Sequence, residues 1–196
     1  SSKRWAKDYE FSSWGSYDVA ALFGRLFFAG YRDSTFTEEV SSLDKGDLRL
    51  ILRDEDAEHI LSKNINYPLE QGYSITVAGT SEKDKFANLI LFKNEERIHE
   101  STVDVGDTFI HEVEDFPVIV IHLANVIGED GFAVVDGTFQ ISDNPIAKLA
   151  KGGVLGNMEL DELSEDGIEF RNAIDLNLER DTQVYLTPNL LLFILD

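Results

Sequence analysis

The sequence predicts an all-β protein, and three features indicate this class. Short runs rich in β-branched and aromatic residues recur through the middle of the chain. Most of these runs begin roughly 10 to 14 residues after the previous one, as in a sandwich of antiparallel strands. The segments between them carry the Gly, Asp, Asn and Ser residues that chain reversals need.

Five runs are predicted as strands: 73–79, 86–93, 107–114, 117–127 and 131–141. The polar segments TSEKDK, KNEER, STVDVGD and GEDG follow or connect them, so hairpins are expected. In 117–127 the row Val118, Val120, His122, Ala124, Val126 should face one way and the row Ile119, Ile121, Leu123, Asn125, Ile127 the other. Both rows are largely apolar, so this strand is expected to be covered on both sides or to lie at a domain junction.

The two ends of the chain are harder to interpret. VAALFGRLFF (19–28) fits either a helix or a strand, and RDEDAEHILS (53–62) fits either a short helix or a polar turn before a strand. LLLFILD (190–196) is apolar but too short to cross a bilayer, so it is predicted to be a buried strand. Its expected partner is the aromatic-rich beginning of the chain, which has no obvious sheet of its own.

Charge and composition exclude several classes of protein. The formal charge of −20, from 37 acidic against 17 basic residues, would repel nucleic acid. Thirteen Phe, six Tyr and two Trp supply the apolar area for a core, so the chain is not a disordered acidic tail. It has no cysteine, which excludes a disulfide framework, a thiolate nucleophile and a zinc–sulfur site.

No stretch reaches the roughly 18 apolar residues of a membrane span, so this segment is not expected to insert into a bilayer. The chain opens SSKRWAKDY without an initiator Met or a signal-peptide core. We therefore expect a segment of a longer protein, with any targeting or anchoring signal elsewhere in it.

No catalytic or cofactor-binding residues are predicted. The histidines are His59, His99, His111 and His122. His111 and His122 lie in predicted neighbouring strands and would be able to face each other as metal ligands. A lone histidine in a strand is more often a packed or surface residue. Four acidic clusters offer oxygen ligands for calcium, but the spacing of their residues does not single out any one cluster, so metal binding stays open. The clusters are Asp54–Asp56, Glu112 with Glu114 and Asp115, Glu129–Asp130, and Asp161–Glu162 with Glu165–Asp166. Trp5, Trp14 and Tyr17 fit a sugar-stacking platform or, more commonly, a core.

Five segments in order carry a resemblance to a known family: WGSYDVAALFG, LRLILRDEDAEHILSKN, YPLEQGYSITVAG, NLILFKNEERIHESTVDVGDTFIHE and FPVIVIHLANVIGEDGFAVVDGTFQISD. Together they resemble the S-layer-related duplication domain of methanogen-type (methanosarcinal) archaeal surface-layer proteins. In that family a W-G-x-Y-like segment comes first, an L-x-x-G-Y-x-L segment follows, and a long hydrophobic strand with a G-x-x-d turn comes later. The resemblance covers nearly the whole chain.

The resemblance implies two connected β-sandwich domains, with residues 47–143 inserted into a first domain built from residues 1–46 and 144–196. It implies a non-enzymatic, extracellular module of an archaeal cell envelope that needs no cofactor. Such modules associate with neighbouring copies of themselves into a two-dimensional lattice whose acidic pores act as a protective, charge-selective sieve. The membrane anchor would lie elsewhere in the full protein.

Two features depart from the family pattern. Asn94 to Glu96 replaces the usual glycine-containing hairpin, and the chain has no N-x-S/T acceptor for N-glycosylation. The alternative function is a carbohydrate- or calcium-binding β-sandwich module of a larger surface enzyme. Exposed, stacked Trp5 and Trp14, or a partly buried pair of carboxylates in a cleft, would favour that alternative.

Overall fold

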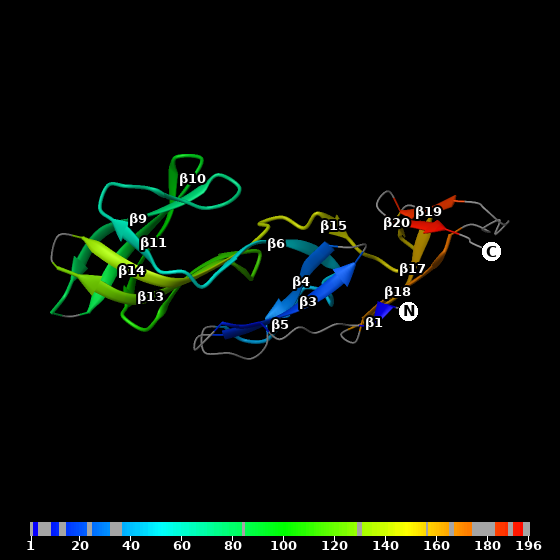
Figure 1. The fold of residues 1–196 in the computed structure, drawn as a ribbon, viewed down its shortest axis with the longest axis horizontal. Helices are drawn as coiled ribbons and strands as arrows, with labels where there is room; N and C mark the ends of the chain where they lie inside the picture. The colour runs from blue at the N-terminus through cyan, green and yellow to red at the C-terminus, as the bar shows by residue number, and fades with distance from the viewer. Residues whose placement is uncertain are drawn as a thin grey trace.

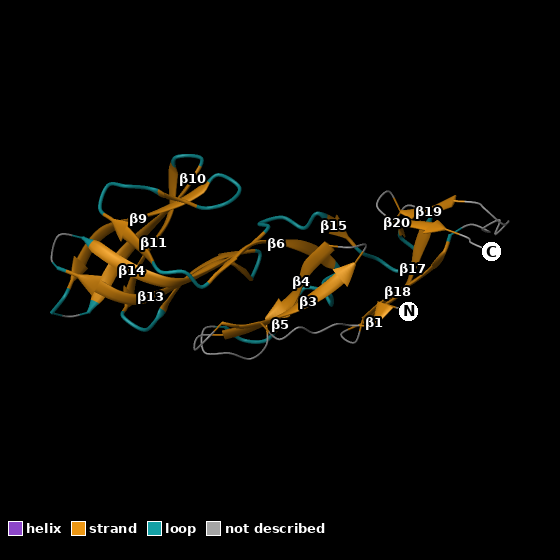
Figure 2. Ribbon diagram, in the orientation of Figure 1, coloured by secondary structure: helices purple, strands orange, loops and turns teal. Residues whose placement is uncertain are grey.

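The computed structural model describes residues 2–3, 9–11, 15–22, 25–31, 37–83, 85–128, 131–155, 157–164, 167–173, 183–187 and 190–193. In these ranges every regular element is a β-strand and none is a helix (Figure 2). The all-β prediction is therefore confirmed. Within the same ranges no helix has the length and apolar character needed to cross a membrane.

The described strands form four sheets (Figure 1). The largest has the order β12 (Thr108–Val113), β13 (Phe116–Ile127), β14 (Phe132–Ile141), β6 (Asp47–Glu55), β4 (Arg25–Tyr31), β3 (Gly15–Leu22) and β2 (Tyr9–Phe11). To it are added β7 (His59–Ser62) beside β14, β15 (Ala147–Lys148) beside β6, and β5 (Val40–Ser41) beside β4. The second sheet has the order β11 (Glu96–Asp104), β10 (Phe86–Lys93), β9 (Tyr73–Ser81) and β8 (Tyr67–Pro68). The third contains β1 (Ser2–Lys3), β18 (Gly167–Asn172), β17 (Met158–Ser164) and β16 (Val154–Leu155), and β19 (Gln183–Thr187) pairs with β20 (Leu190–Phe193) in the fourth.

The five strands predicted from the sequence correspond to β9, β10, β12, β13 and β14, with bounds that agree within two residues. One strand, β11, was missed between β10 and β12. Its side chains are mostly exposed and many are charged, so it shows neither the apolar run nor the apolar alternation of a buried strand. In residues 53–62 the end of β6 is followed by the connection 56–58 and then by β7, so this segment contains a turn leading into a strand and no helix. The described part of 19–28 lies in the β3–β4 hairpin and is therefore strand.

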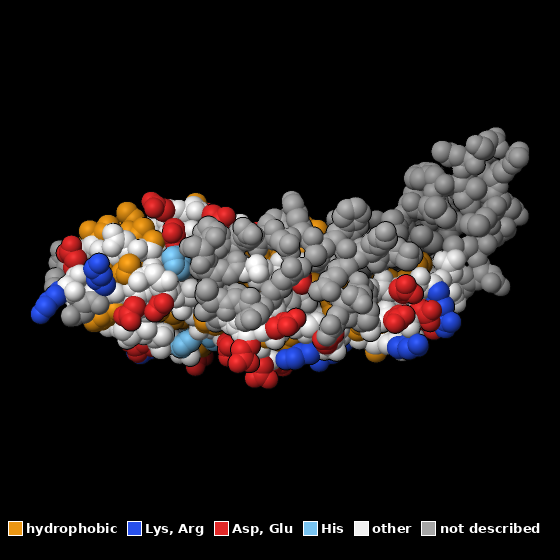
Figure 3. Space-filling view, turned by 90° about the horizontal axis from the view of Figure 1, so that it is seen from below, with side chains coloured by type: hydrophobic (Ala, Val, Ile, Leu, Met, Phe, Trp, Pro, Cys, Tyr) orange, Lys and Arg blue, Asp and Glu red, His pale blue; other side chains and the backbone are white. Residues whose placement is uncertain are grey.

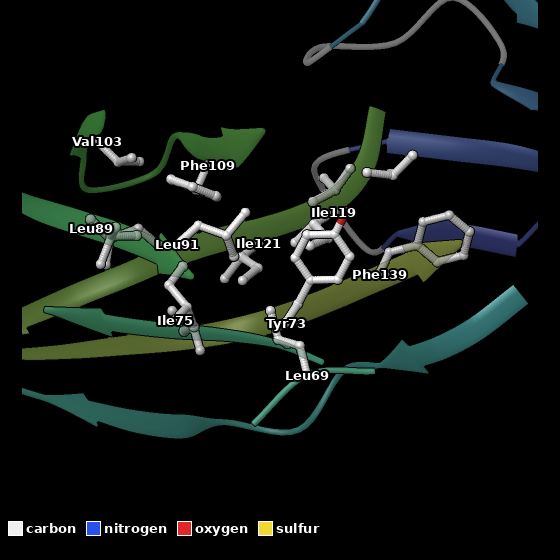
Figure 4. Packing of buried hydrophobic residues seen from close by; sticks show 14 of the residues in the cluster. Leu69, Tyr73, Ile75, Leu89, Leu91, Val103, Phe109, Ile119, Ile121 and Phe139 are labelled. Carbon is white, nitrogen blue, oxygen red and sulfur yellow. The ribbon is translucent and has the colours of Figure 1, made fainter. Parts of the chain in front are cut away.

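The larger hydrophobic core lies between the second sheet and the β12–β13–β14 part of the large sheet. Figure 4 shows Ile75, Leu89 and Leu91 of the second sheet beside Phe109 and Ile121 of the large one. All five side chains are almost fully removed from water, which stabilises the fold by roughly 1.5–3 kcal/mol for each large apolar side chain. This core therefore holds the two sheets face to face, as in a sandwich.

The β3–β4 hairpin buries both of its faces. Along β4, Phe28 and Tyr31 belong to the larger core, whereas Phe27 and Ala29 belong to a smaller core with Leu48, Leu160 and Ile168. In the larger core the ring of Tyr17 lies 4.3 Å from that of Phe139, and the ring of Phe28 lies 4.6 Å from that of Tyr31. Because neighbouring residues of β4 enter different cores, the hairpin connects the larger core to the smaller one (Figure 1).

β13 is buried on both sides over its first half, as its two apolar rows predicted: every residue from Phe116 to Leu123 is buried. Beyond Leu123 the two rows differ, as their alternation predicts: Val126 is buried while Asn125 and Ile127 are exposed. The pairing with β14 shifts register on both sides of Leu123. Register shifts of this kind cannot be read from an apolar run.

The C-terminal strand does not have the predicted partner. β20 pairs with β19 in a two-stranded sheet, and in the described residues no pairing joins it to the beginning of the chain. Instead the N-terminal strand β1 pairs with β18, which places residues 2–3 beside 167–168. Trp5, Trp14 and residues 194–196 lie outside the described residues.

Two hairpin turns contain residues in the left-handed region of backbone conformation. The β10–β11 turn has Asn94 at φ 49° and Glu95 at φ 69°, and the β12–β13 turn has Glu114 at φ 52° and Asp115 at φ 65°. Two-residue turns with positive φ at both positions match the twist of the flanking strands. The hairpin at 94–95 therefore keeps this turn geometry without glycine.

We predict that Glu95→Gly raises the free energy of unfolding by about 1 kcal/mol, because glycine relieves the left-handed strain that a side chain imposes. Urea denaturation measures the change. Glu96→Gly is the matched control: it removes the same charge one residue later, inside β11, and should lower stability by about 0.5–1 kcal/mol. Equal changes in the two variants would contradict the turn assignment.

Candidate functional site

The most unusual buried side chain is Arg49, on β6. Its neighbour Leu48 enters the smaller core, so Arg49 points to the opposite face of the sheet, where its side chain is 0% exposed. Its Nη1 donates hydrogen bonds to the backbone oxygens of Ser142 at 2.9 Å and Asp143 at 2.8 Å. The arginine thus fastens the beginning of β6 to the segment that follows β14.

Carboxylates and an aromatic ring surround the rest of the guanidinium. Nη2 lies 3.5 Å from Oδ2 of buried Asp47 and 3.7 Å from Oε2 of Glu114, whose side chain is 67% exposed. The guanidinium carbon lies 4.5 Å from the ring centre of Phe116, and Nζ of Lys45 lies 4.3 Å from the same centre. Nε and Nη2 have no hydrogen-bond acceptor among the described atoms, so charge and the ring quadrupole offset their desolvation.

Asp143 continues this network on its other side. Its carboxylate accepts hydrogen bonds from Nζ of Lys93, at the end of β10, and from the hydroxyl of Tyr73, at the start of β9, the latter at 3.3 Å. Its backbone N–H donates to Oε1 of Gln71 at 3.0 Å. We name Arg49, Asp143, Lys93 and Tyr73 the junction cluster, because its members connect β6, the end of β14 and the second sheet.

The ionisation of the junction cluster favours the ion pair. Burial acts to raise the pKa of Asp143, but the hydrogen bonds and positive charge of Lys93 outweigh it, so the pKa of Asp143 lies below its usual value. Burial acts to lower the pKa of Lys93, yet its bonds to Asp143 and Tyr73 raise the pKa of Lys93. Both groups are therefore held charged, with the carboxylate and the ammonium bound to each other rather than available as a general acid or base.

Two histidines lie next to the junction cluster. The ring of His111, on β12, lies 5.9 Å from Tyr73 and 5.5 Å from His99, on β11. Burial lowers the pKa of His111 to about 4, and neighbouring His99 and Lys93 act in the same direction. His111 is therefore neutral near neutral pH.

His111 and His122, which the sequence left able to face each other, are not opposite: the register of β12 and β13 places His111 opposite Ile119 and His122 opposite Thr108. His122 Nδ1 lies 2.5 Å from Oδ1 of Asp136, and its Nε2 lies 3.1 Å from the backbone oxygen of Gly106. The sequence missed the partner of His111, which is His99, because β11 was not recognised as a strand. His59, the remaining histidine, lies 3.0 Å from Glu55 and stacks near Tyr67.

Described members of the acidic clusters named from the sequence have partners in different parts of the fold. Asp54 accepts a 2.7 Å hydrogen bond from the hydroxyl of Tyr17, Glu114 lies near Arg49, and Asp161 lies 4.0 Å from Arg171. Glu129, Asp130, Glu165 and Asp166 lie outside the described residues. In the part of the chain that is described, no three His, Asp or Glu side chains are grouped so as to hold a metal ion.

One polar pocket of about 400 Å³ lies beside β4 and β5, lined by Asp18, Ala29, Gly30, Tyr31, Glu39, Val40, Ser41 and Asp44. Asp18, Glu39 and Asp44 make its lining acidic. Tyr31, at its wall, uses its hydroxyl to donate a 2.7 Å hydrogen bond to the backbone oxygen of Pro117. The pocket thus adds to the negative character of the surface, while the junction cluster is a structural joint.

A family model described as S-layer protein matches residues 1–196, the whole chain. No curated protein matches the sequence.

We predict that Arg49→Met lowers the free energy of unfolding by about 3–5 kcal/mol, because it leaves Asp47 and two backbone oxygens buried without their charged partner. Urea denaturation measures the loss. Arg171→Met is the control: its ion pair with Glu159 is exposed to solvent, so its loss should change stability far less than the loss of Arg49. Similar losses in both variants would contradict the role of Arg49.

We also predict that stability falls as the pH drops from 6.5 towards 4, the interval between the ordinary pKa of histidine and that of folded His111. The unfolded chain binds a proton at this histidine more readily than the folded chain, so acid favours unfolding. Because the side chain is only half buried, we expect a loss of about 1–2 kcal/mol after allowing for solvent screening. Urea denaturation at several pH values tests this.

His111→Gln should remove most of that loss, and His59→Gln, which changes a histidine beside Glu55, should retain it. An unchanged pH dependence in His111→Gln would contradict the assignment. Further loss below the ordinary pKa of Asp is expected in every variant, since the pKa of Asp143 is depressed in the folded chain.

Proposed function

We propose a function for this chain from the fact that it belongs to the S-layer protein family, the methanosarcinal S-layer duplication domain family, over its whole length. This family is structural and non-enzymatic, and it places the chain at the cell surface, in the cell envelope. The family resemblance drawn from the sequence is thereby confirmed. The proposal is that copies of the chain assemble side by side into a two-dimensional lattice with acidic pores, which acts as a protective, charge-selective sieve.

The family match over residues 1–196 is the observation that carries this proposal. The fold supports it, because a lattice unit must keep its shape under lateral load. The first half of β13 is buried on both faces, and the junction cluster links β6 to the second sheet. Both features resist relative movement of the sheets. The chain would serve as a rigid spacer between lattice contacts.

The charge distribution supports the selective part of the proposal. Asp and Glu side chains lie along the central part of the face in Figure 3, and others line the pocket beside β4. A net charge of −20 on each copy would place a negative potential in openings between copies, within a screening length of roughly 10 Å at 0.1 M salt. Such openings would favour cations over anions.

We further propose the discontinuous domain arrangement, with residues 47–143 inserted between 1–46 and 144–196. An inserted domain needs its two ends close together. In support, the N–H of Leu50 donates to Oγ of Ser142 at 3.0 Å, and the N–H of Ser142 donates to the backbone oxygen of Leu50 at 2.9 Å. Arg49 strengthens the same contact. The β-sheet itself continues through β6 into both parts, so the parts would move as one unit.

We predict that the purified 196-residue chain, concentrated on a lipid surface, forms ordered two-dimensional arrays visible by electron microscopy. Arrays on a porous support should pass a cationic dye faster than an anionic dye of equal size at about 0.01 M salt, where screening is weak, and equally at about 1 M salt. Glu162→Gln should change neither result, because the charge is spread over many exposed acids.

Arrays that pass both dyes equally at low salt would contradict the charge-selective sieve while leaving the lattice intact. If the chain stays monomeric on every surface and binds calcium or a glycan in a parallel calorimetric titration, the lattice function is wrong. A large loss of assembly in Glu162→Gln would contradict the diffuse role of the acids.

A further inference from the structure

The outer faces of β7, β14 and β13 share an uncharged surface. The strand register places Ile60 opposite Val134 and Val134 opposite Asn125. In the next row Ser62 lies opposite Phe132, and Phe132 lies opposite Ile127. Directly opposite residues share one face of a sheet, so these side chains are neighbours. We name them the outer patch: Ile60, Ser62, Asn125, Ile127, Phe132 and Val134.

The outer patch exposes large apolar side chains that the core does not use. Ile60 is 63% exposed, Ile127 47% and Phe132 40%. The intervening residues Leu61 and Ala133 point inward and are buried. Hydrophobic side chains are also visible on the surface at this end of the molecule in Figure 3. A contiguous exposed apolar surface on a folded domain usually marks a place where another molecule binds.

Charge decides which molecule fits. Each copy of the chain carries a formal charge of −20, so most surfaces of two copies repel each other. None of the outer-patch side chains is charged, and among the described residues Asp136, two positions along β14 from Val134, is paired with His122. A patch placed on another region of the acidic surface would bury carboxylates against apolar groups, at a high desolvation cost. When the outer patches of two copies face each other, none of the side chains that the two patches bury is charged.

We propose that the outer patch is a two-fold contact between copies of this chain. This deepens the proposed lattice function and rests on it, since it names the surface through which two copies meet. A two-fold axis brings the same side chains together from both copies, as self-complementary contacts require. The contact is small, so one pair binds weakly, and simultaneous contacts in a lattice give it strength.

Salt distinguishes this contact from an ionic one. Added salt screens the repulsion between the acidic surfaces and leaves apolar contact unaffected, so association through the outer patch strengthens as salt rises. Analytical ultracentrifugation of the chain should show salt-promoted dimers. Ile127→Glu should weaken dimerisation at least about tenfold by placing two carboxylates in the contact. Ile98→Glu, an exposed isoleucine on β11 that is 41% exposed, is the matched control and should dimerise like the unchanged chain.

Single cysteines report the geometry directly, because the chain has none of its own. We expect Ile60→Cys, Asn125→Cys or Ile127→Cys to form a disulfide-linked dimer rapidly under mild oxidation, and Ile98→Cys to form none at the same rate. Circular dichroism checks that each variant is folded. Equal cross-linking at all four positions, or equal dimerisation of Ile127→Glu and Ile98→Glu, would overturn the proposal.

Electron microscopy separates this inference from the proposed function. If Ile127→Glu forms arrays identical to those of the unchanged chain, the outer-patch contact is wrong and the lattice function stands. If the unchanged chain dimerises through the patch and forms no arrays, the contact stands and the lattice function fails. Loss of arrays in Ile127→Glu alone, with Ile98→Glu unaffected, supports both.

Discussion

The fold depends on a positive charge that has been removed from water. Arg49 lies fully buried on β6, and its guanidinium is compensated by two backbone oxygens, by Asp47 and Glu114, and by the ring of Phe116. A buried guanidinium without these partners would cost several kcal/mol. The need to compensate its charge therefore constrains the position of every partner. That requirement fixes where residues 142–143 lie beside β6, and Asp143 in turn positions Lys93 and Tyr73 of the second sheet.

Strands buried on both faces give the rest of the structure its stiffness. β13 is buried on both faces from Phe116 to Leu123, within the core that also contains side chains of the second sheet and aromatic residues of β3 and β4. β4 likewise divides its side chains between two cores. A displacement of either strand would disturb two packed interfaces at once, and close-packed interiors resist such strain. This property suits a protein whose work is to hold spacing rather than to change shape.

Negative charge and apolar exposure have separate locations on this chain. Acids are spread over turns, exposed strand positions and the pocket beside β4, and many of those that are buried or half-buried are paired with a base or a hydroxyl. The outer patch on β7, β13 and β14 is uncharged. Repulsion over most of the surface and attraction over one face together limit the ways in which two copies can meet. Specific association can arise from such a surface without a strong pairwise affinity.

The sequence by itself determined the all-β class, the positions of β9, β10, β12, β13 and β14, and the two-sided burial of 117–123, because local apolar pattern and turn chemistry record these features. It also determined the acidic surface and the family resemblance. It did not reveal β11, whose charged side chains face water, or the register shifts on both sides of Leu123, which depend on the pairing with β14. It also did not reveal that Arg49, His99 and His111 lie at the junction of the sheets. Only the tertiary structure decided these, since the two backbone oxygens that bind Arg49 stand more than ninety residues away in the chain, and no local pattern encodes a contact of that range.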